Sequence, residues 1–401
     1  MAEASRGSPG NFENRMETAT RELSSPRGAT ISILAGFVVA GVATTLLGPI
    51  LPFLISRWSL TDQQAGLFFT FQFAGSMAGV AALSDLLPRW GYKFILVAGF
   101  VAIALGIAAL SARAHLVGLA GTAIFGFGLG FVLSSSNLWI AEAARSRRVA
   151  ALSVLNFAWG IGAIACPPLV LLAQHHSRIP TFLCAVAAGA LAAGLILLAV
   201  DLKVPLSGVE RAEGAQEIGA SEMAAISLGA LFFLYVGTEN CVAGWAAAFA
   251  RRMGAATHGI WALAPMFFWA GLMAGRALVP VNPLRGNEKL LVSIGLGMGL
   301  AGSASLLAIQ SFRALACCVA LAGLGFAAIY PVLVAWMAKR FGKRARRTGS
   351  IMFALGGLGG AIMPWTVGFF STREGSLRTG LIVPAASCAV MLALLRWIPK
   401  Q

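Results

Sequence analysis

Residues 94–112 read FILVAGFVAIALGIAALSA, an apolar run without a charged side chain. A helix of about 20 predominantly apolar residues is long enough to cross the hydrocarbon core of a bilayer. The run is therefore predicted to be a transmembrane helix. Similar runs lie on both sides of it, separated by short polar breaks, from Ile31 to the C-terminal region.

The composition of the whole chain favours the bilayer over water as its solvent. Hydrophobic residues make up 58% of the 401 residues and charged residues 11%, with a mean hydropathy of +0.81. An average soluble domain has about a quarter charged residues. At about 20–25 residues per span the chain accommodates about twelve spans, so the predicted fold class is an all-α membrane protein. The expected spans are 31–56, 63–84, 94–112, 116–141, 149–173, 180–200, 224–249, 258–280, 290–310, 314–338, 348–370 and 377–397.

Lysine and arginine gather in alternate loops, and this pattern sets the expected orientation. Clusters occur at 89–93, 145–148, 276–289 and 339–347. Because basic residues are enriched on the cytoplasmic side, we expect a multi-pass protein of the inner or plasma membrane with both termini in the cytoplasm. The same bias accounts for the net charge of +15 without a nucleic-acid partner. Residues 1–30 contain no apolar segment of the kind found in signal peptides.

A long polar interruption divides the chain into two similar parts. We predict a cytoplasmic N-terminal tail (1–30), a first six-helix half (31–200), a cytoplasmic linker (201–223) and a second six-helix half (224–398). Glycines recur between the halves at a nearly constant offset, which indicates an internal duplication of the kind found in secondary transporters. The matched glycines are Gly75 and Gly79 with Gly271 and Gly275, Gly41 with Gly237, Gly48 with Gly244, Gly160 and Gly162 with Gly357 and Gly359, and Gly128 and Gly130 with Gly323 and Gly325.

The sequence offers no arrangement typical of an enzyme. The six cysteines lie in apolar spans, and the four histidines lie in or beside predicted outward loops, without the spacing of metal ligands. No phosphate-binding glycine motif follows a predicted strand. We therefore expect no catalytic activity, no cofactor and no metal.

Acidic residues, asparagine, glutamine and tryptophan are absent from the apolar run of every third span and occur in the other spans. This distribution predicts that spans three, six, nine and twelve face lipid, while the remaining spans enclose a polar cavity. Aromatic faces and amides in such a cavity suit sugars and other polyhydroxylated solutes. Helix packing is the alternative role for each of them. The candidate solute-binding residues are Gln72, Asn137, Asn156, Trp159, Asn240, Trp269 and Trp365.

Glu239 lies deep in the seventh span, close to the expected middle of the bilayer. A carboxylate in hydrocarbon costs several kcal/mol unless it faces water, finds a partner or becomes protonated. Tyr235 lies one helical turn before it and could hydrogen-bond to it. Ala43 occupies the equivalent position of the first half, so the acid belongs to one half only. We therefore single out Glu239 and Tyr235 as candidates for proton coupling, with a fixed interhelical bond as the alternative.

Several motifs resemble those of a known transporter family. Gly79-x5-Asp85-x3-Arg89-x-Gly91-x-Lys93 is similar to the cytoplasmic signature of the major facilitator superfamily. The stretches 155–167, 235–245, 330–331 and 359–365 resemble the fucose:proton symporter branch of that family. The resemblance implies twelve helices in two pseudo-symmetric halves and solute transport between them. It also implies that Asn156 lies near the solute, and that Gly79, Asp85, Arg89, Gly275 and Arg276 form a cytoplasmic latch between the halves.

The chain departs from the sugar:proton members of that branch in one respect. Those proteins use acids in the first and fourth spans, whereas residues 31–56 contain no acid and the fourth span has Asn137 at its middle. Glu239 is therefore the strongest candidate for a coupling acid. The sequence predicts a monomeric secondary transporter in the lipid bilayer that moves a small polar, sugar-like solute by alternating access, with proton symport through Glu239 as a hypothesis.

Two other functions remain open at this point. An antiporter that uses protons to export drugs or metabolites is compatible with an aromatic cavity. A solute sensor that binds its ligand without transporting it belongs to another class and is also compatible with the sequence.

Overall fold

The structure, a computed structural model, describes residues 27–202, 222–254, 259–279, 287–341 and 345–398. Its secondary structure in these ranges is helical, without a strand. The helices are α2 (Arg27–Thr45), α3 (Leu47–Trp58), α4 (Asp62–Ala109), α5 (His115–Ala143), α6 (Arg148–His175), α7 (Ile179–Leu198), α8 (Glu222–Arg252), α9 (Ala264–Leu278), α10 (Glu288–Ser305), α11 (Phe312–Phe326), α12 (Ile329–Phe341), α13 (Ala345–Glu374), α14 (Leu377–Gly380) and α15 (Ile382–Leu394).

These helices confirm the twelve expected spans. Ten helical segments are long and apolar enough to cross a membrane in the described ranges. One of them, α4, contains two spans, because Gly91 adopts φ 71° and turns the chain back between them. The ninth span, α10, is not among the ten, since Glu288 and Lys289 lie in its first turn.

Two spans are interrupted in the structure. The first breaks between α2 and α3, and the tenth breaks at Ala327 and Ala328 between α11 and α12. Pro49 and Pro331 lie in the first turn of the helix that follows each break. Because proline has no N–H, the carbonyl four residues earlier loses its helical donor, and the interruption is placed there.

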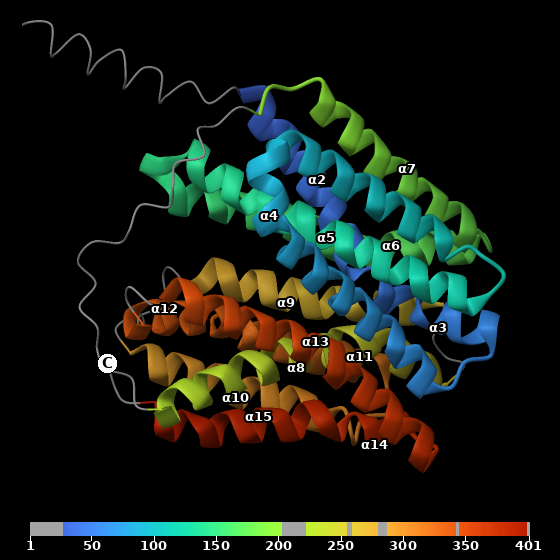
Figure 1. Cartoon of the computed structure of the whole chain (residues 1–401). Coiled ribbons are helices and arrows are strands. Elements are labelled where there is room, and N and C mark those ends of the chain that lie inside the picture. Colours follow the sequence, from blue (N-terminus) through green and yellow to red (C-terminus); the bar gives the residue numbers. More distant parts are fainter. Residues whose placement is uncertain (1–26, 203–221, 255–258, 280–286, 342–344, 399–401) are drawn as a thin grey trace, which may run out of the picture.

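The helices form two groups (Figure 1). α2 and α4 to α7 pack in one group, and α8 to α15 pack in the other, with α3 directed toward the second group. α7 ends and α8 begins at the same end of the molecule, which we call the α7–α8 end; Asp62 lies at the opposite end, the Asp62 end. The predicted tail (1–30) and linker (201–223) fall largely outside the described residues, so their boundaries remain predictions.

Equivalent glycines make equivalent contacts in the two halves. A methyl group on Gly75 would lie 2.1 Å from the carbonyl oxygen of Ala123, and one on Gly271 would lie 2.3 Å from that of Ala320. Glycine is needed at both places because two helix backbones approach closely there. The same helix pair, α4 with α5 or α9 with α11, thus packs in the same way twice, which confirms the duplication.

The structure corrects one part of the glycine alignment. The sequence pairs Gly128 with Gly323, but Gly128 packs against the carbonyl of Gly99, whereas Gly325 packs against that of Gly295. Since Gly99 and Gly295 are equivalent, the partner of Gly128 is Gly325, two residues further along. A Gly-x-Gly pattern matches itself when shifted by two, so the sequence could not distinguish these registers.

The closest backbone contacts provide a test of the packing. Methyl groups on Gly162 and Gly359 would lie 2.0 and 1.9 Å from the carbonyl oxygens of Val38 and Phe233, whereas Gly189 has no atom within 4 Å. We expect Gly162→Leu and Gly359→Leu each to destabilise the protein by about 1–3 kcal/mol through overpacking. Thermal unfolding in detergent measures the effect, with Gly189→Leu as the control. Equal melting temperatures for all three variants would contradict the assigned contacts.

Candidate functional site

The two halves are joined at the Asp62 end by a buried carboxylate. Arg252, at the end of α8, donates two hydrogen bonds to Asp62, from Nη1 to Oδ2 at 2.6 Å and from Nη2 to Oδ1 at 2.5 Å. The Ser371 hydroxyl of α13 donates to the same carboxylate. The Asp62 side chain is 7% exposed and that of Arg252 41%. Charge-assisted bidentate pairs of this kind are among the stronger hydrogen bonds in proteins.

The helix start at Asp62 explains why this carboxylate is fixed in place. The Thr61 hydroxyl accepts the Gln64 N–H and the Gln64 side chain accepts the Thr61 N–H, which forms a capping box. The Gln63 N–H, another free donor of the first turn, is bound by the Thr372 hydroxyl at 2.9 Å. A helix of the second half therefore satisfies a backbone donor of the first half.

A second arginine reinforces this end. Arg251 donates from Nη1 to the carbonyl of Pro52 at 2.5 Å and to the Ser56 hydroxyl at 2.8 Å, both on α3. Adjacent arginines of α8 thus bind two different helices of the first half. We call Asp62, Arg251, Arg252, Ser371 and Thr372 the inter-half clamp.

Further from the clamp, the halves touch at two equivalent places. A methyl group on Gly357 of α13 would lie 2.7 Å from Met77 of α4, and one on Gly160 of α6 would lie 2.4 Å from Met273 of α9. Met77 corresponds to Met273 and Gly160 to Gly357 in the repeat. Each half therefore places a methionine against a glycine of the other.

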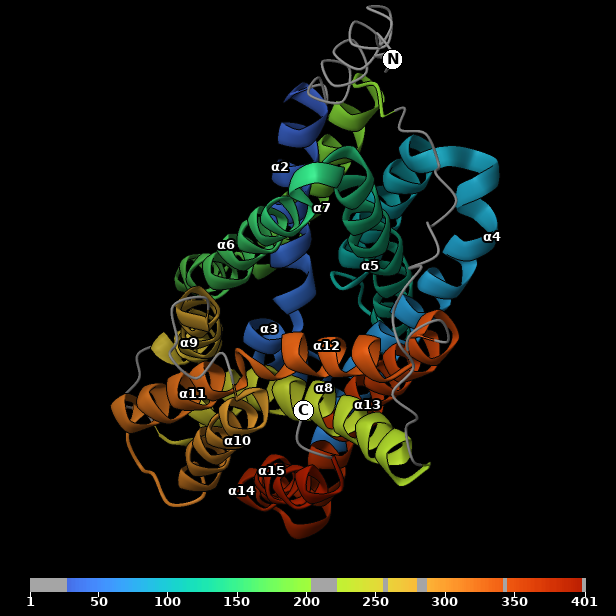
Figure 2. The same cartoon turned by 90° about the vertical axis from the view of Figure 1, so that its left-hand side faces the viewer.

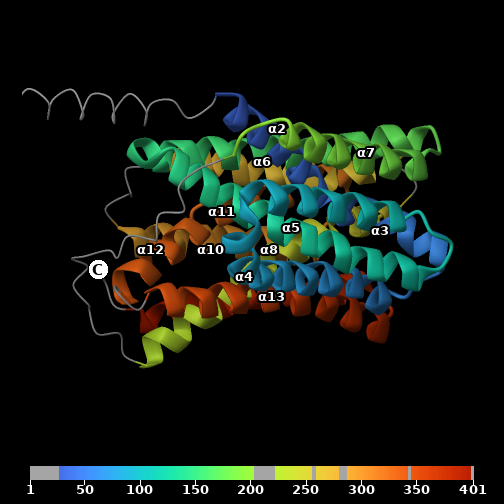
Figure 3. The same cartoon turned by 45° about the horizontal axis from the view of Figure 1, so that its top comes forward.

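Beyond these contacts, toward the α7–α8 end, the same helix faces are exposed. Asn156 precedes Gly160 by one turn and is exposed, and Phe353 precedes Gly357 by one turn and is 45% exposed. Figure 2, viewed from this end, shows the two groups of helices apart, and Figure 3 shows α13 beside α4 over part of its length. The interface is closed at the Asp62 end and open at the α7–α8 end.

Aromatic and amide candidates meet at the closed part of this interface. Trp159 of the first half and Trp269 of the second lie edge to face with centroids 5.4 Å apart. The Trp159 indole N–H donates to the Thr44 hydroxyl at 3.4 Å, and the Gln72 amide donates to the Thr44 carbonyl at 3.1 Å. These contacts bring Gln72, Trp159 and Trp269 together, and Asn156 lies one turn from Trp159 toward the open side.

The other candidates are not joined to this group by the contacts of the described residues. Asn137 and Asn240 each donate to a carbonyl of their own helix, at 2.7 and 2.8 Å. Trp365 packs on Phe369 of its own helix and approaches Gly66. Their solute-binding roles stay predictions.

Glu239 lies midway along α8 and is partly exposed. Tyr235 and the Arg276 guanidinium of α9 both interact electrostatically with it. The Tyr235 hydroxyl also donates to the Phe326 carbonyl at 3.2 Å, next to the break in the tenth span. Arg276 has a buried Nε without a hydrogen-bond partner in the described part of the chain.

The predicted cytoplasmic latch makes no contact between the halves in this conformation. Asp85 and Arg89 are exposed at the α7–α8 end, and no hydrogen bond among the described residues joins them to the second half. Gly79 packs on Phe127 and Gly275 on Ala327, each within its own half. Arg276 lies with Glu239 instead. The latch remains a prediction for a state in which this end closes.

The sequence did not identify the inter-half clamp. Asp62, Arg251 and Arg252 are charged residues at span ends, where solvated charges are ordinary. Asp62 and Arg252 are separated by 190 positions. A capping box beginning at Thr61 was the one local signal that could have drawn attention to Asp62.

Comparison with known proteins places the chain in a family. Residues 33–281 match the model of the Major Facilitator Superfamily. No curated protein matches the sequence. The fold is similar to that of a D-xylose–proton symporter, with 15% identity, a TM-score of 0.77, and coverage of 94% of this chain and 99% of that one.

Two further solved structures have the same fold. A nucleoside transporter is 14% identical with a TM-score of 0.70, covering 93% of this chain and 99% of the other. The fucose:proton symporter of E. coli is 18% identical with a TM-score of 0.59, covering 93% and 98%. The family match, over more than half of the sequence, identifies the protein class. The chain belongs to the Major Facilitator Superfamily, and is a membrane transporter rather than an enzyme.

Proposed function

We propose that the protein is a secondary active transporter of a small polar, sugar-like solute, working by alternating access in the inner or plasma membrane. The observation that carries this proposal is the interface between the halves, which is clamped at the Asp62 end and exposed at the other. With both termini in the cytoplasm, the conformation is inward-open. Similar folds transport xylose, fucose and nucleosides, which supports this solute class.

The two methionine–glycine contacts suit the pivot of this motion. They are equivalent in the repeat and lie where the closed part of the interface ends. Rotation of the halves about these contacts would open the clamp and close the α7–α8 end. The Met side chain is flexible, and glycine leaves a smooth helix surface, so such a contact can roll without a steric barrier.

The solute would bind beside the Trp159–Trp269 pair. Aromatic faces pack against the apolar face of a sugar ring, and the Asn156 amide can donate to and accept from hydroxyl groups. Trp159 and Trp269 come from different halves, so a solute bound here contacts both and favours the state in which they enclose it.

Glu239 is the proposed coupling residue. A charged carboxylate must keep water or a counter-ion, and Arg276 supplies positive charge nearby. Protonation removes the negative charge and lowers the cost of enclosing the side chain. Tyr235 links Glu239 to the break of the tenth span through its bond to Phe326, so a change in this cluster can act on the helix that bends.

Crosslinking can test the pivot against the clamp in a cysteine-free background. The Thr372 hydroxyl accepts the Gln63 N–H at 2.9 Å across the two halves, so a Gln63→Cys/Thr372→Cys pair holds the Asp62 end shut. We expect this disulfide to abolish uptake by proteoliposomes and a reductant to restore it. The Met77→Cys/Gly357→Cys pair at the pivot should retain much more uptake when oxidised. Full uptake by the oxidised Gln63/Thr372 pair would contradict the mechanism.

Removing the clamp charge should open the Asp62 end. Asp62→Asn leaves Arg252 without its ionic partner, at a cost of about 1–3 kcal/mol to the clamped state. Spin labels at Arg113→Cys and Arg373→Cys, exposed on different halves at this end, should report a larger population of long distances. Glu288→Gln is the control, since its ion pair with Lys339 lies within one half. An unchanged distance distribution in Asp62→Asn would reject the clamp.

The coupling role of Glu239 has its own test. D-xylose, L-fucose and a nucleoside form the first panel for a thermal-shift screen of the purified protein. With a solute that binds, Glu239→Gln should abolish the alkalinisation of the medium that accompanies uptake, because the amide cannot carry a proton. Glu142→Gln, which alters an acid bonded to Tyr92 within the first half, should leave it intact. Undiminished proton-coupled uptake by Glu239→Gln would refute this role.

The same preparations separate the two rival functions. An efflux antiporter would protect expressing cells against toxic organic cations and would not accumulate sugars. A sensor would show stabilisation by ligand without flux in proteoliposomes. We favour the transporter, because the exposed and clamped ends of one interface are what a change between two access states requires.

A further inference from the structure

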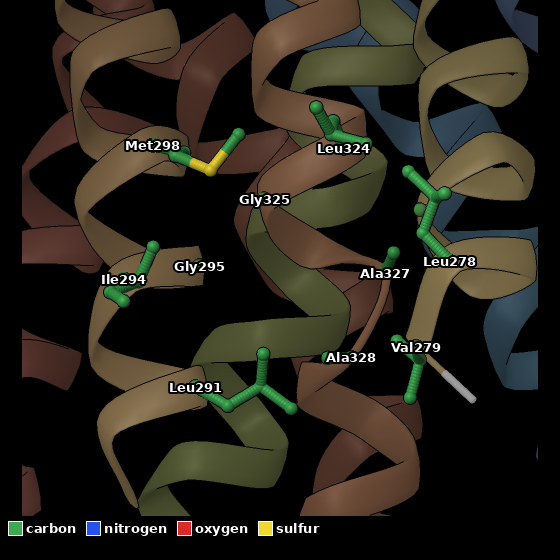
Figure 4. Close-up of a pocket in the computed structure, with 11 residues that line it drawn as sticks. Leu278, Val279, Leu291, Ile294, Gly295, Met298, Leu324, Gly325, Ala327 and Ala328 are labelled. Atoms are coloured by element: carbon green, nitrogen blue, oxygen red, sulfur yellow. The ribbon is translucent and has the colours of Figure 1, made fainter. Parts of the chain in front are cut away.

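An apolar pocket of about 210 Å³ lies in the second half, away from the interface (Figure 4). It is formed by α9, α10, α11 and the break between α11 and α12. Its lining contains no charged or polar side chain: leucine, isoleucine, valine, methionine, alanine and glycine alone contribute. A polar solute would lose its hydrogen bonds there, so the pocket is separate from the proposed transport site.

The internal repeat shows what fills the equivalent space in the first half. With the corrected register, Ala328 in the pocket corresponds to Phe131, and Gly295 corresponds to Gly99. Phe131 is 3% exposed, and its Cβ lies 3.0 Å from where a methyl group on Gly99 would be. Its ring also lies 4.6 Å from that of Phe127, the equivalent of the lining residue Leu324. A phenyl ring thus occupies the place that Ala328 leaves empty.

The pocket opens on a surface that faces away from the first half. Leu278 is 56% exposed and Ile294 43% exposed at its edge. The main neighbours of α10 are α11 and α15, both within the second half. A transmembrane helix with an exposed apolar face meets hydrocarbon, so the pocket is continuous with the lipid-facing surface.

We propose that this pocket binds an acyl chain of a membrane lipid. Apolar cavities of about 150 Å³ admit a guest as large as benzene, so the volume suffices for a chain segment. Lipid tails are as apolar as leucine, so transfer from the bilayer gains no hydrophobic energy. The acyl chain is held by dispersion contacts with the lining, which an empty pocket lacks. In the first half, the Phe131 ring makes the equivalent contacts.

The bound chain would act on the break of the tenth span. Ala327 and Ala328 form both the break and part of the pocket wall. Tyr330 follows two residues later and packs against Tyr235, with centroids 6.0 Å apart. An occupant therefore supports the segment that adjoins the Glu239 cluster, although the binding site does not depend on the transport mechanism.

Photolabelling tests the site directly. The probe is phosphatidylcholine with a diazirine in one acyl chain, reconstituted with the full-length protein and mapped by peptide mass spectrometry. We expect labelled residues among 275–279, 291–298 and 324–328, and loss of this labelling in Ala328→Phe, which restores the residue of the first half. Ala188→Phe, at an exposed alanine of α7, is the matched control and should keep the labelling. Equal labelling of the lining in wild type and Ala328→Phe would overturn the proposal.

A second measurement covers the case in which the phenylalanine variant does not fold. Ala328→Leu fills the pocket with a smaller side chain. In detergent, added phosphatidylcholine should raise the melting temperature of the wild type more than that of Ala328→Phe or Ala328→Leu. In these variants the larger side chain at position 328 already occupies the pocket. An equal lipid-dependent shift in wild type and in the variant that folds would reject the site.

Discussion

The absence of water in the bilayer core is the constraint on which this structure depends. Each backbone N–H and C=O there must be bonded within the protein, and helices meet this requirement within a single segment. Because lipid tails are as apolar as the side chains, the hydrophobic effect no longer drives the association of helices. Close packing between the helices must hold them together instead. This explains why glycines such as Gly75 and Gly162 face carbonyl groups of neighbouring helices at distances that no side chain tolerates. The same packing leaves smooth surfaces on which helices can move.

Duplication supplies the framework twice, and both the proposed coupling residue and the proposed lipid pocket lie where the copies differ. The second half has Glu239 at the position where the first half has Ala43, so only the second half carries an acid there. The second half has Ala328 at the position where the first half has Phe131, and the smaller side chain leaves a pocket beside the break of the tenth span. Both differences lie in the second half, near Tyr235 and Tyr330. The second half therefore combines the ionisable cluster with the pocket beside the interrupted tenth span.

The contacts between the halves divide by chemistry along the molecule. At the Asp62 end they are charge-assisted hydrogen bonds, which are strong but can exchange with water when the halves separate. In the middle they are methionine and tryptophan contacts, which adapt to small rotations. An interface with this order holds one state firmly and still offers a path to another, because its polar bonds lie where water can replace them.

The sequence by itself determined the helical membrane fold, the twelve spans, the duplication and the position of Glu239, because hydropathy and glycine spacing are local properties. It did not determine the register of the fourth and tenth spans, where Gly128 matches Gly325, since a Gly-x-Gly pattern repeats after two residues. Asn156, Trp159 and Trp269 were chosen from sequence, but only the fold brought Trp159 against Trp269. The clamp between Asp62 and Arg252 and the pocket at Ala328 were likewise decided by the tertiary structure. Their partners are far apart in the chain, and only the packing of the helices brings them into contact.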